Sequence, residues 1–91
     1  MRAKNEMVLR EVAGEHILIP VGQMALQVKG MISLSESGCL LWQKLQQDCT
    51  LEELTDAILA EYDVDRETAR QDVQEFLDRL DGLGILVKDE A

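Results

Sequence analysis

The stretch from Ile32 to Leu45 constrains the fold of this chain more than any other part of the sequence. Its first three residues have the composition of a short strand, and the small and apolar residues that follow have the spacing of a helix. Two more helices are predicted, one over Leu51 to Tyr62 and one from Asp65 to Gly82 or Gly84. A short apolar segment, residues 85–87, follows them. A strand and then three closely spaced helices is the element order of a winged helix-turn-helix-like domain.

Each predicted helix carries a local start signal. Ser35 is a good N-cap for the first helix, and Thr50 with Glu53 has the spacing of a capping box for the second. Asp65 is suited to cap the third. Gly38 lowers the propensity of the first helix by about 1 kcal/mol relative to alanine, which indicates close approach by a neighbouring backbone. The apolar stripe of the third helix comprises Ala69, Val73, Phe76, Leu77, Leu80 and Leu83.

The N-terminal half predicts a β-hairpin. Met7–Val12 and Glu15–Val21 are rich in β-forming residues and are joined by Ala13-Gly14, a tight-turn pair. Pro20 cannot donate a backbone hydrogen bond, so it belongs at a strand end or an edge. Residues 22–30 are expected to form a partly extended loop or to continue the strand, and residues 30–34 form a short third strand. The predicted class is α+β, with an N-terminal three-stranded antiparallel β-sheet followed by three α-helices.

The length of 91 residues fits one domain. We expect a flexible N-terminus over residues 1–6, a single domain over residues 7–87 and an acidic tail over residues 88–91. No apolar run approaches the roughly 20 residues that span a bilayer, and the N-terminus lacks an apolar signal segment. We therefore expect a cytoplasmic protein that does not associate with a membrane.

The charge argues against a nucleic-acid partner. Nine basic residues stand against eighteen acidic ones, a formal net charge of −9. Binding to phosphate depends on lysine and arginine displacing counterions. The third helix, where a helix-turn-helix protein places its groove-reading residues, is itself net negative. Its basic residues are Arg66, Arg70 and Arg79, and its acidic ones are Glu67, Asp72, Glu75, Asp78 and Asp81.

No residue pattern indicates catalysis, a metal or a cofactor. Cys39 and Cys49 are ten residues apart with no second cysteine or histidine close to either, so the spacing fits neither a zinc site nor a redox pair. We expect both to be reduced thiols, with Cys39 filling a small space in the core. His16 lies beside Glu15 in a predicted strand without a partner for acid–base chemistry. We therefore predict that the protein is not an enzyme.

The sequence resembles the PqqD family, the coenzyme PQQ synthesis protein D and its relatives, over roughly residues 7–87. One departure is the entry to the first helix, where the family commonly has Leu-Asn-Glu-Thr and this chain has Leu34-Ser-Glu-Ser37. Serine caps a helix as well as asparagine does. The matching segments are Leu34-Ser-Glu-Ser-Gly38 with Leu41, Trp42 and Leu45; Thr50–Leu54; Glu61–Asp65; Asp72-Val73 with Phe76, Leu77 and Leu80; and Gly84–Leu86.

The resemblance implies a non-catalytic peptide chaperone of the class called RiPP recognition elements. Such proteins hold the leader of a ribosomally made precursor peptide and present the precursor to a modifying enzyme, in the PQQ pathway a radical S-adenosylmethionine (SAM) protein. In the family the leader adds as a strand to the third strand and packs beside the third helix, which is β-augmentation. The candidate peptide-binding residues are Met31, Ile32, Ser33, Leu34, Arg70, Val73, Gln74 and Leu77.

Two points about the third strand stay open from the sequence. Alternation puts Ile32 and Leu34 on one face and Met31 and Ser33 on the other, with the larger pair favoured for the core. An open strand edge also invites pairing with a second copy, so we expect a monomer or a weak dimer. We expect such a dimer to form by strand pairing or by exchange of the hairpin, with residues 22–30 as the hinge.

Two other functions fit parts of the pattern. An adaptor or docking subunit of a larger enzyme fits the acidic surface. A winged-helix DNA-binding regulator fits the element order but not the charge.

Overall fold

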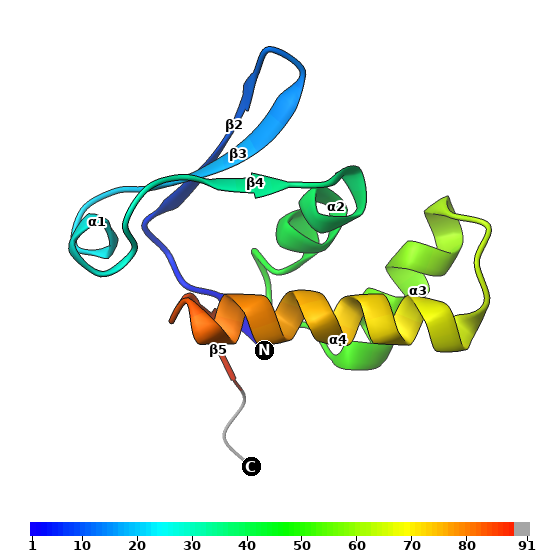
Figure 1. Cartoon of the computed structure of the whole chain (residues 1–91). Coiled ribbons are helices and arrows are strands. Elements are labelled where there is room, and N and C mark those ends of the chain that lie inside the picture. Colours follow the sequence, from blue (N-terminus) through cyan, green and yellow to red (C-terminus); the bar gives the residue numbers. More distant parts are fainter. Residues whose placement is uncertain (89–91) are drawn as a thin grey trace.

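The computed structural model describes residues 1–88 and has the predicted α+β architecture (Figure 1). A three-stranded antiparallel sheet with the order β2-β3-β4 is followed by three helices of two or more turns, as the sequence predicts. A short helix and a second, two-stranded sheet of β1 and β5 were not predicted. The elements are β1 (Arg2–Ala3), β2 (Met7–Val12), β3 (Glu15–Pro20), α1 (Met24–Gln27), β4 (Ile32–Leu34), α2 (Glu36–Lys44), α3 (Leu51–Glu61), α4 (Arg66–Gly82) and β5 (Leu86–Val87).

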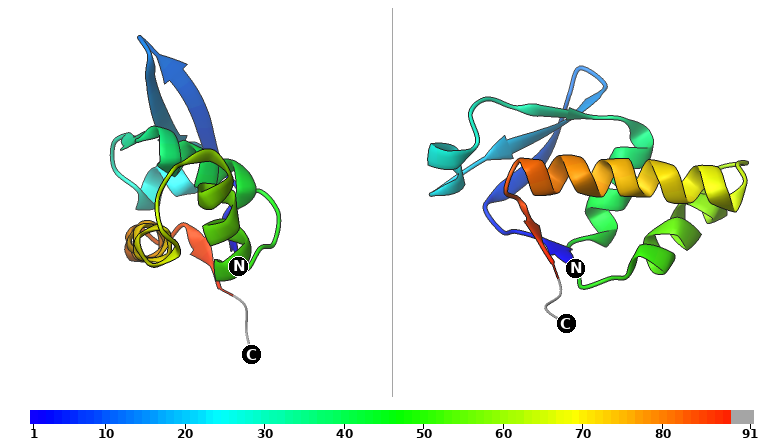
Figure 2. Two further views of the ribbon diagram at one scale, coloured as in Figure 1. Left: turned by 90° about the vertical axis from the view of Figure 1, so that its right-hand side faces the viewer. Right: turned by 60° about the horizontal axis from the view of Figure 1, so that its bottom comes forward.

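The predicted hairpin is formed by β2 and β3. Its turn residues have positive φ angles, 53° at Ala13 and 83° at Gly14, which match the right-handed twist of the flanking strands. Pro20 pairs with Met7 and is the last residue of β3, the position that its missing N–H predicts. The tip of the hairpin points away from α4, which the left view of Figure 2 shows end-on.

Residues 22–30 adopt neither of the two predicted forms. They contain α1, a single helical turn that buries Met24 and, at its end, Val28. The side chain of Glu6 accepts a hydrogen bond of 3.1 Å from the Met24 amide, which satisfies a donor at the start of this turn. The four-residue spacing of Met24 and Val28 places both on one side of the turn, and that side faces the core.

The N-terminal segment, residues 1–6, which we expected to be flexible, contains a short strand in the structure. Arg2 and Ala3 form β1, which pairs antiparallel with β5, and Ala3 is buried. The Ala3 amide also donates a 2.8 Å hydrogen bond to the carbonyl of Leu45. These partners are far away in the sequence, so no local pattern indicates them. Of the predicted acidic tail, only Lys88 lies within the described residues, and it forms a 2.9 Å ion pair with Asp81.

The helices begin where their caps predict. The Ser35 hydroxyl accepts from the Gly38 amide at 3.1 Å, and Asp65 accepts from the Thr68 amide at 2.9 Å. Thr50 and Glu53 form a complete capping box, each accepting from the amide of the other. Within residues 1–88, no helix is both long and apolar enough to cross a bilayer.

The core lies between the inner face of the sheet and the helices. Trp42 is 3% exposed and lies in this core. The fully buried side chains are Leu18, Leu45, Leu54, Thr55, Val73, Leu80 and Ile85.

Candidate functional site

The strand β4 lies at the edge of the three-stranded sheet. It pairs with β3 on one side, with Ile17 opposite Ser33 and Leu18 opposite Ile32. Ile32 and Leu34 are buried, whereas Ser33 is exposed and Met31, just before the strand, is 66% exposed. The larger pair therefore faces the core, as favoured from the sequence, and the side chains of Ile32 and Leu34 are not available to a partner.

A groove of about 410 Å³ lies between α4 on one side and, on the other, α2 with its cap Ser35, which directly follows β4. In Figure 1 α4 runs below β4 and α2. The groove contains apolar, hydroxyl and charged groups, and its far end reaches α3. It is lined by Ser35, Ser37, Gly38, Leu41, Ile58, Asp72, Glu75, Phe76 and Arg79.

Gly38 of α2 lies close to the Phe76 side chain of α4 in this groove. A Cβ atom at Gly38 would lie 3.3 Å from the Phe76 ring and 3.3 Å from the Ser35 hydroxyl. The sequence indicated such a close approach, but the neighbours are side chains and not a backbone. Phe76 itself is only partly buried, so its ring forms part of the groove wall.

One face of α4 is turned toward β4. The guanidinium of Arg79 donates a 3.4 Å hydrogen bond to the carbonyl of Ser33. Phe76, Glu75 and Asp72 precede Arg79 by three, four and seven residues, so they share its side of the helix, and they line the same groove. None of these four residues was predicted from the sequence to bind a peptide. In the sequence they can be found as a row of mostly charged positions along one side of the buried stripe of α4.

The four α4 residues selected from the sequence lie elsewhere. Val73 is fully buried and Leu77 is 4% exposed, so both belong to the core. Arg70 is ion-paired with Glu52 of α3 at 3.1 Å. Gln74 donates to the carboxylate of Asp78 at 2.9 Å.

Helix geometry explains this placement. Arg70 precedes Arg79 by nine residues, which at about 100° per residue places the two on opposite sides of the helix. The structure therefore does not bring Arg70 and Gln74 to the edge of β4. Gln74 and Leu77 line another hollow, of about 270 Å³, beside Met1, Leu51 and Leu86.

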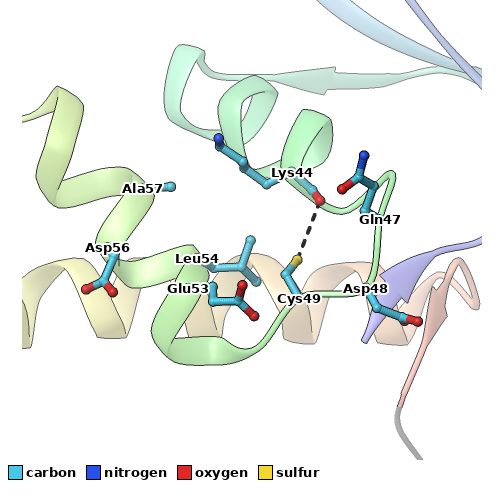
Figure 3. Close-up of a pocket in the computed structure, with 8 residues that line it drawn as sticks. All are labelled: Lys44, Gln47, Asp48, Cys49, Glu53, Leu54, Asp56 and Ala57. Carbon is cyan, nitrogen blue, oxygen red and sulfur yellow. Dashed lines mark hydrogen bonds between the residues drawn. The ribbon is translucent and has the colours of Figure 1, made fainter.

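A further hollow, of about 440 Å³, lies between the end of α2 and α3 (Figure 3). Its wall is largely polar, with Lys44, Glu53 and Asp56 among its residues, and Cys49 donates a hydrogen bond from its thiol to the Lys44 carbonyl at 3.5 Å. Its lining residues come from α2, α3 and the segment between these helices.

The pKa values of Cys39 and Asp65 are shifted, and neither shift indicates an activated nucleophile. Burial, with a smaller effect of the Glu11 carboxylate, raises the pKa of the Cys39 thiol, which favours its protonated form. Hydrogen bonds from Thr68 lower the pKa of Asp65, as its capping role requires. Residues 1–88 contain no group of three or more histidine, cysteine, aspartate or glutamate side chains that could hold a metal ion.

Comparisons with known proteins agree on one family and one fold. The model of the family described as coenzyme PQQ synthesis protein D (PqqD) matches residues 15–86, which include β3, β4 and all of α2 to α4. A search of curated proteins finds no match.

Two solved structures share the fold. The chain is similar to TbiB1, solved in complex with the TbiA(beta) leader peptide, with 27% identity over all of both chains and a TM-score of 0.76. It is also similar to lasso peptide synthetase B1, solved in complex with the leader peptide, with 17% identity over 96% of each chain and a TM-score of 0.74. The second likeness shows the fold alone. Since the family model covers most of the sequence, the chain belongs to the PqqD family.

Proposed function

We propose that this protein is a non-catalytic RiPP recognition element. It binds the leader of a ribosomally synthesised precursor peptide and presents the precursor to a modifying enzyme. The observation that carries the proposal is an edge strand beside a groove, in a fold shared over its full length with a leader-bound protein.

Strand addition explains how such a site binds a peptide. The leader pairs through its backbone with residues 31–34 at the edge of β4, and this pairing supplies affinity without requiring one sequence. Ile32 and Leu34 contribute only their backbone groups, because their side chains are buried. Met31 and Ser33 are exposed and can contact alternate side chains of the leader.

The second wall of the site is the groove face of α4. We propose contacts of the leader with Asp72, Glu75, Phe76 and Arg79, which line the groove. This proposal replaces the sequence-based choice of Arg70, Val73, Gln74 and Leu77, because two of those side chains are buried and the other two lie on the far side of α4.

The proposed partner is an enzyme that modifies peptides in the cytoplasm, where the thiol of Cys39 stays reduced. A radical SAM protein is the class that membership of the PqqD family favours. Another peptide-modifying enzyme is the alternative partner. A nucleic-acid partner is disfavoured, because Arg66 and Arg70 of α4 already pair with carboxylates of α3 and the chain is strongly acidic.

Fluorescence anisotropy tests the proposal. Labelled leader peptides, synthesised from short reading frames beside the gene, should bind saturably, and scrambled versions of the same composition should bind much more weakly. Binding of the neighbouring modifying enzyme is then measured with and without the leader. A protein that binds the enzyme but none of these peptides is an adaptor, and the proposal is then wrong.

A further inference from the structure

Arg79 differs from the other arginines of α4 in its partner. Arg66 and Arg70 are each ion-paired with carboxylates of α3. Arg79 forms no ion pair within the described chain, and its guanidinium donates to a backbone carbonyl, that of Ser33 on the edge strand. In the two-residue hairpin the backbone groups of Ile17 face β2, so Ile17 and Ser33 form a non-hydrogen-bonded pair and the Ser33 carbonyl points to the open side of β4.

The hydrogen bond between Arg79 and Ser33 is one that a peptide can replace. Its donor–acceptor distance of 3.4 Å is long and its atoms are exposed, so it is weak. A charged side chain over an edge strand is also a common device against uncontrolled strand pairing. An incoming strand that pairs with β4 can supply a backbone N–H to the same edge, which releases the guanidinium.

The charges in the groove are unequally distributed. Arg79 lies next to β4, whereas Asp72 lies about two helical turns nearer the start of α4, with Glu75 between them. Arg79 is the one basic residue among those that line this groove. A carboxylate on a bound peptide is therefore attracted at one register, opposite Ser33, and repelled at registers closer to Asp72 and Glu75.

We propose that Arg79 is a specificity-determining residue of the leader site. It covers the Ser33 carbonyl in the free protein and pairs with an aspartate or glutamate side chain of the bound strand, which fixes the register of that strand. The planar guanidinium suits this role because it can donate two parallel hydrogen bonds to one carboxylate. This inference rests on the proposed function, since it names the chemistry that the leader must present at that site.

Selection from a phage-displayed library of random 12-residue peptides tests the role of Arg79. The wild-type protein should enrich peptides with aspartate or glutamate at one position. The variant R79E should lose that preference and favour lysine or arginine there. For the best wild-type peptide, replacing its carboxylate residue by glutamine should weaken binding to the wild type by about tenfold or more and leave binding to R79E unimpaired.

The matched control is R70E, which changes the net charge by the same amount on the opposite side of α4. It should keep the peptide preference of the wild type, and thermal unfolding by circular dichroism checks the fold of both variants. If R79E does not fold, R79Q replaces it and should lose the acidic preference without gaining a basic one.

Two results separate the possible failures. A wild type that enriches no peptide contradicts the proposed function and with it the role of Arg79. A wild type and an Arg79 variant that enrich the same peptides overturn the role of Arg79 alone.

Discussion

The guanidinium of Arg79 on α4 donates a hydrogen bond to the carbonyl of Ser33 on β4, across 46 residues of sequence. This contact identifies the face of the last helix that meets the open edge of the sheet. Phe76 lies one turn away on the same face and, like Gly38 at the start of α2, lines the groove. The edge strand offers a peptide backbone groups for hydrogen bonding, and the face of α4 offers side chains for contact.

Truncation of the two large aromatic residues should separate stability from binding. Trp42 is 3% exposed, so Trp42→Ala should lower the free energy of unfolding by about 3–5 kcal/mol. Phe76 is only partly buried, so Phe76→Ala should cost less stability but weaken peptide binding severalfold. Urea denaturation and fluorescence anisotropy measure the two effects. Equal peptide affinity of Phe76→Ala and the wild type would exclude Phe76 from the site.

A methyl group at Gly38 should narrow the groove. Gly38→Ala gains about 1 kcal/mol of helix propensity, but its Cβ would lie 3.3 Å from the Phe76 ring and push that ring outward. We expect little change in stability and a severalfold loss of peptide affinity. Gly82→Ala is the matched control, since nothing lies within 4 Å of the added Cβ. It should leave the affinity unchanged, and a Gly38→Ala protein that binds like the wild type contradicts this account of the groove.

The Asp65 cap of α4 should make the stability of the protein depend on pH in the acidic range. The pKa of Asp65 is lowered from its ordinary value of 3.8 by hydrogen bonds from Thr68. Its charged form is therefore favoured by folding, and the stabilisation is present above that ordinary value and is lost as the pH falls through the lower folded pKa. Asp65→Ala should be less stable than the wild type at pH 7, and the difference should shrink as the pH falls below the ordinary value.

Urea denaturation at pH 7 and below the ordinary pKa of Asp65 gives the difference in unfolding free energy between the wild type and Asp65→Ala. The contributions of the other acidic groups are nearly the same in both proteins and largely cancel. Asp65→Asn keeps a capping oxygen without a titrating group, so it should retain most of the stability at pH 7. A difference between Asp65→Ala and the wild type that stays constant with pH would rule out the charged cap.

The open edge of β4 should also govern self-association. We predict that the free protein is a monomer or a weak dimer. A bound leader and a second copy of the chain should compete for the edge of β4. Exchange of the hairpin must free Met24 and Val28 from the core, so direct strand pairing is the easier route. Sedimentation over a concentration series should show dimers that disappear when peptide is added. A tight dimer that takes up peptide without dissociating excludes the competition.

Local signals made the three long helices and the hairpin predictable from the sequence. The capping box of Thr50 and Glu53 and the turn at Ala13 and Gly14 use residues that are neighbours in the chain. The sheet of β1 and β5 was missed, because it joins the two ends of the domain and depends on tertiary contacts. The turn α1 was missed because the alternation of apolar residues from Met24 onward imitates a strand.

The site was only partly predictable for a related reason. Apolar periodicity identified the buried stripe of α4, including Val73 and Leu77, but it does not show which flank of that stripe meets β4. Arg70 and Arg79 border opposite sides of the stripe, and only the packing of α4 against β4 distinguishes them. The edge strand itself was identified, since the order of the strands follows from the hairpin and the short third strand.

The most direct test of the central claim is an NMR titration of the isotopically labelled protein with the leader peptide that it binds best. The account predicts that amide shift changes cluster on residues 31–34 and on Asp72, Glu75, Phe76 and Arg79, with the side-chain Nε–H signal of Arg79 among the largest changes. Changes that cluster on Arg70 and Gln74 would instead favour the opposite side of α4. Changes confined to residues 50–62 would contradict strand addition at β4 altogether.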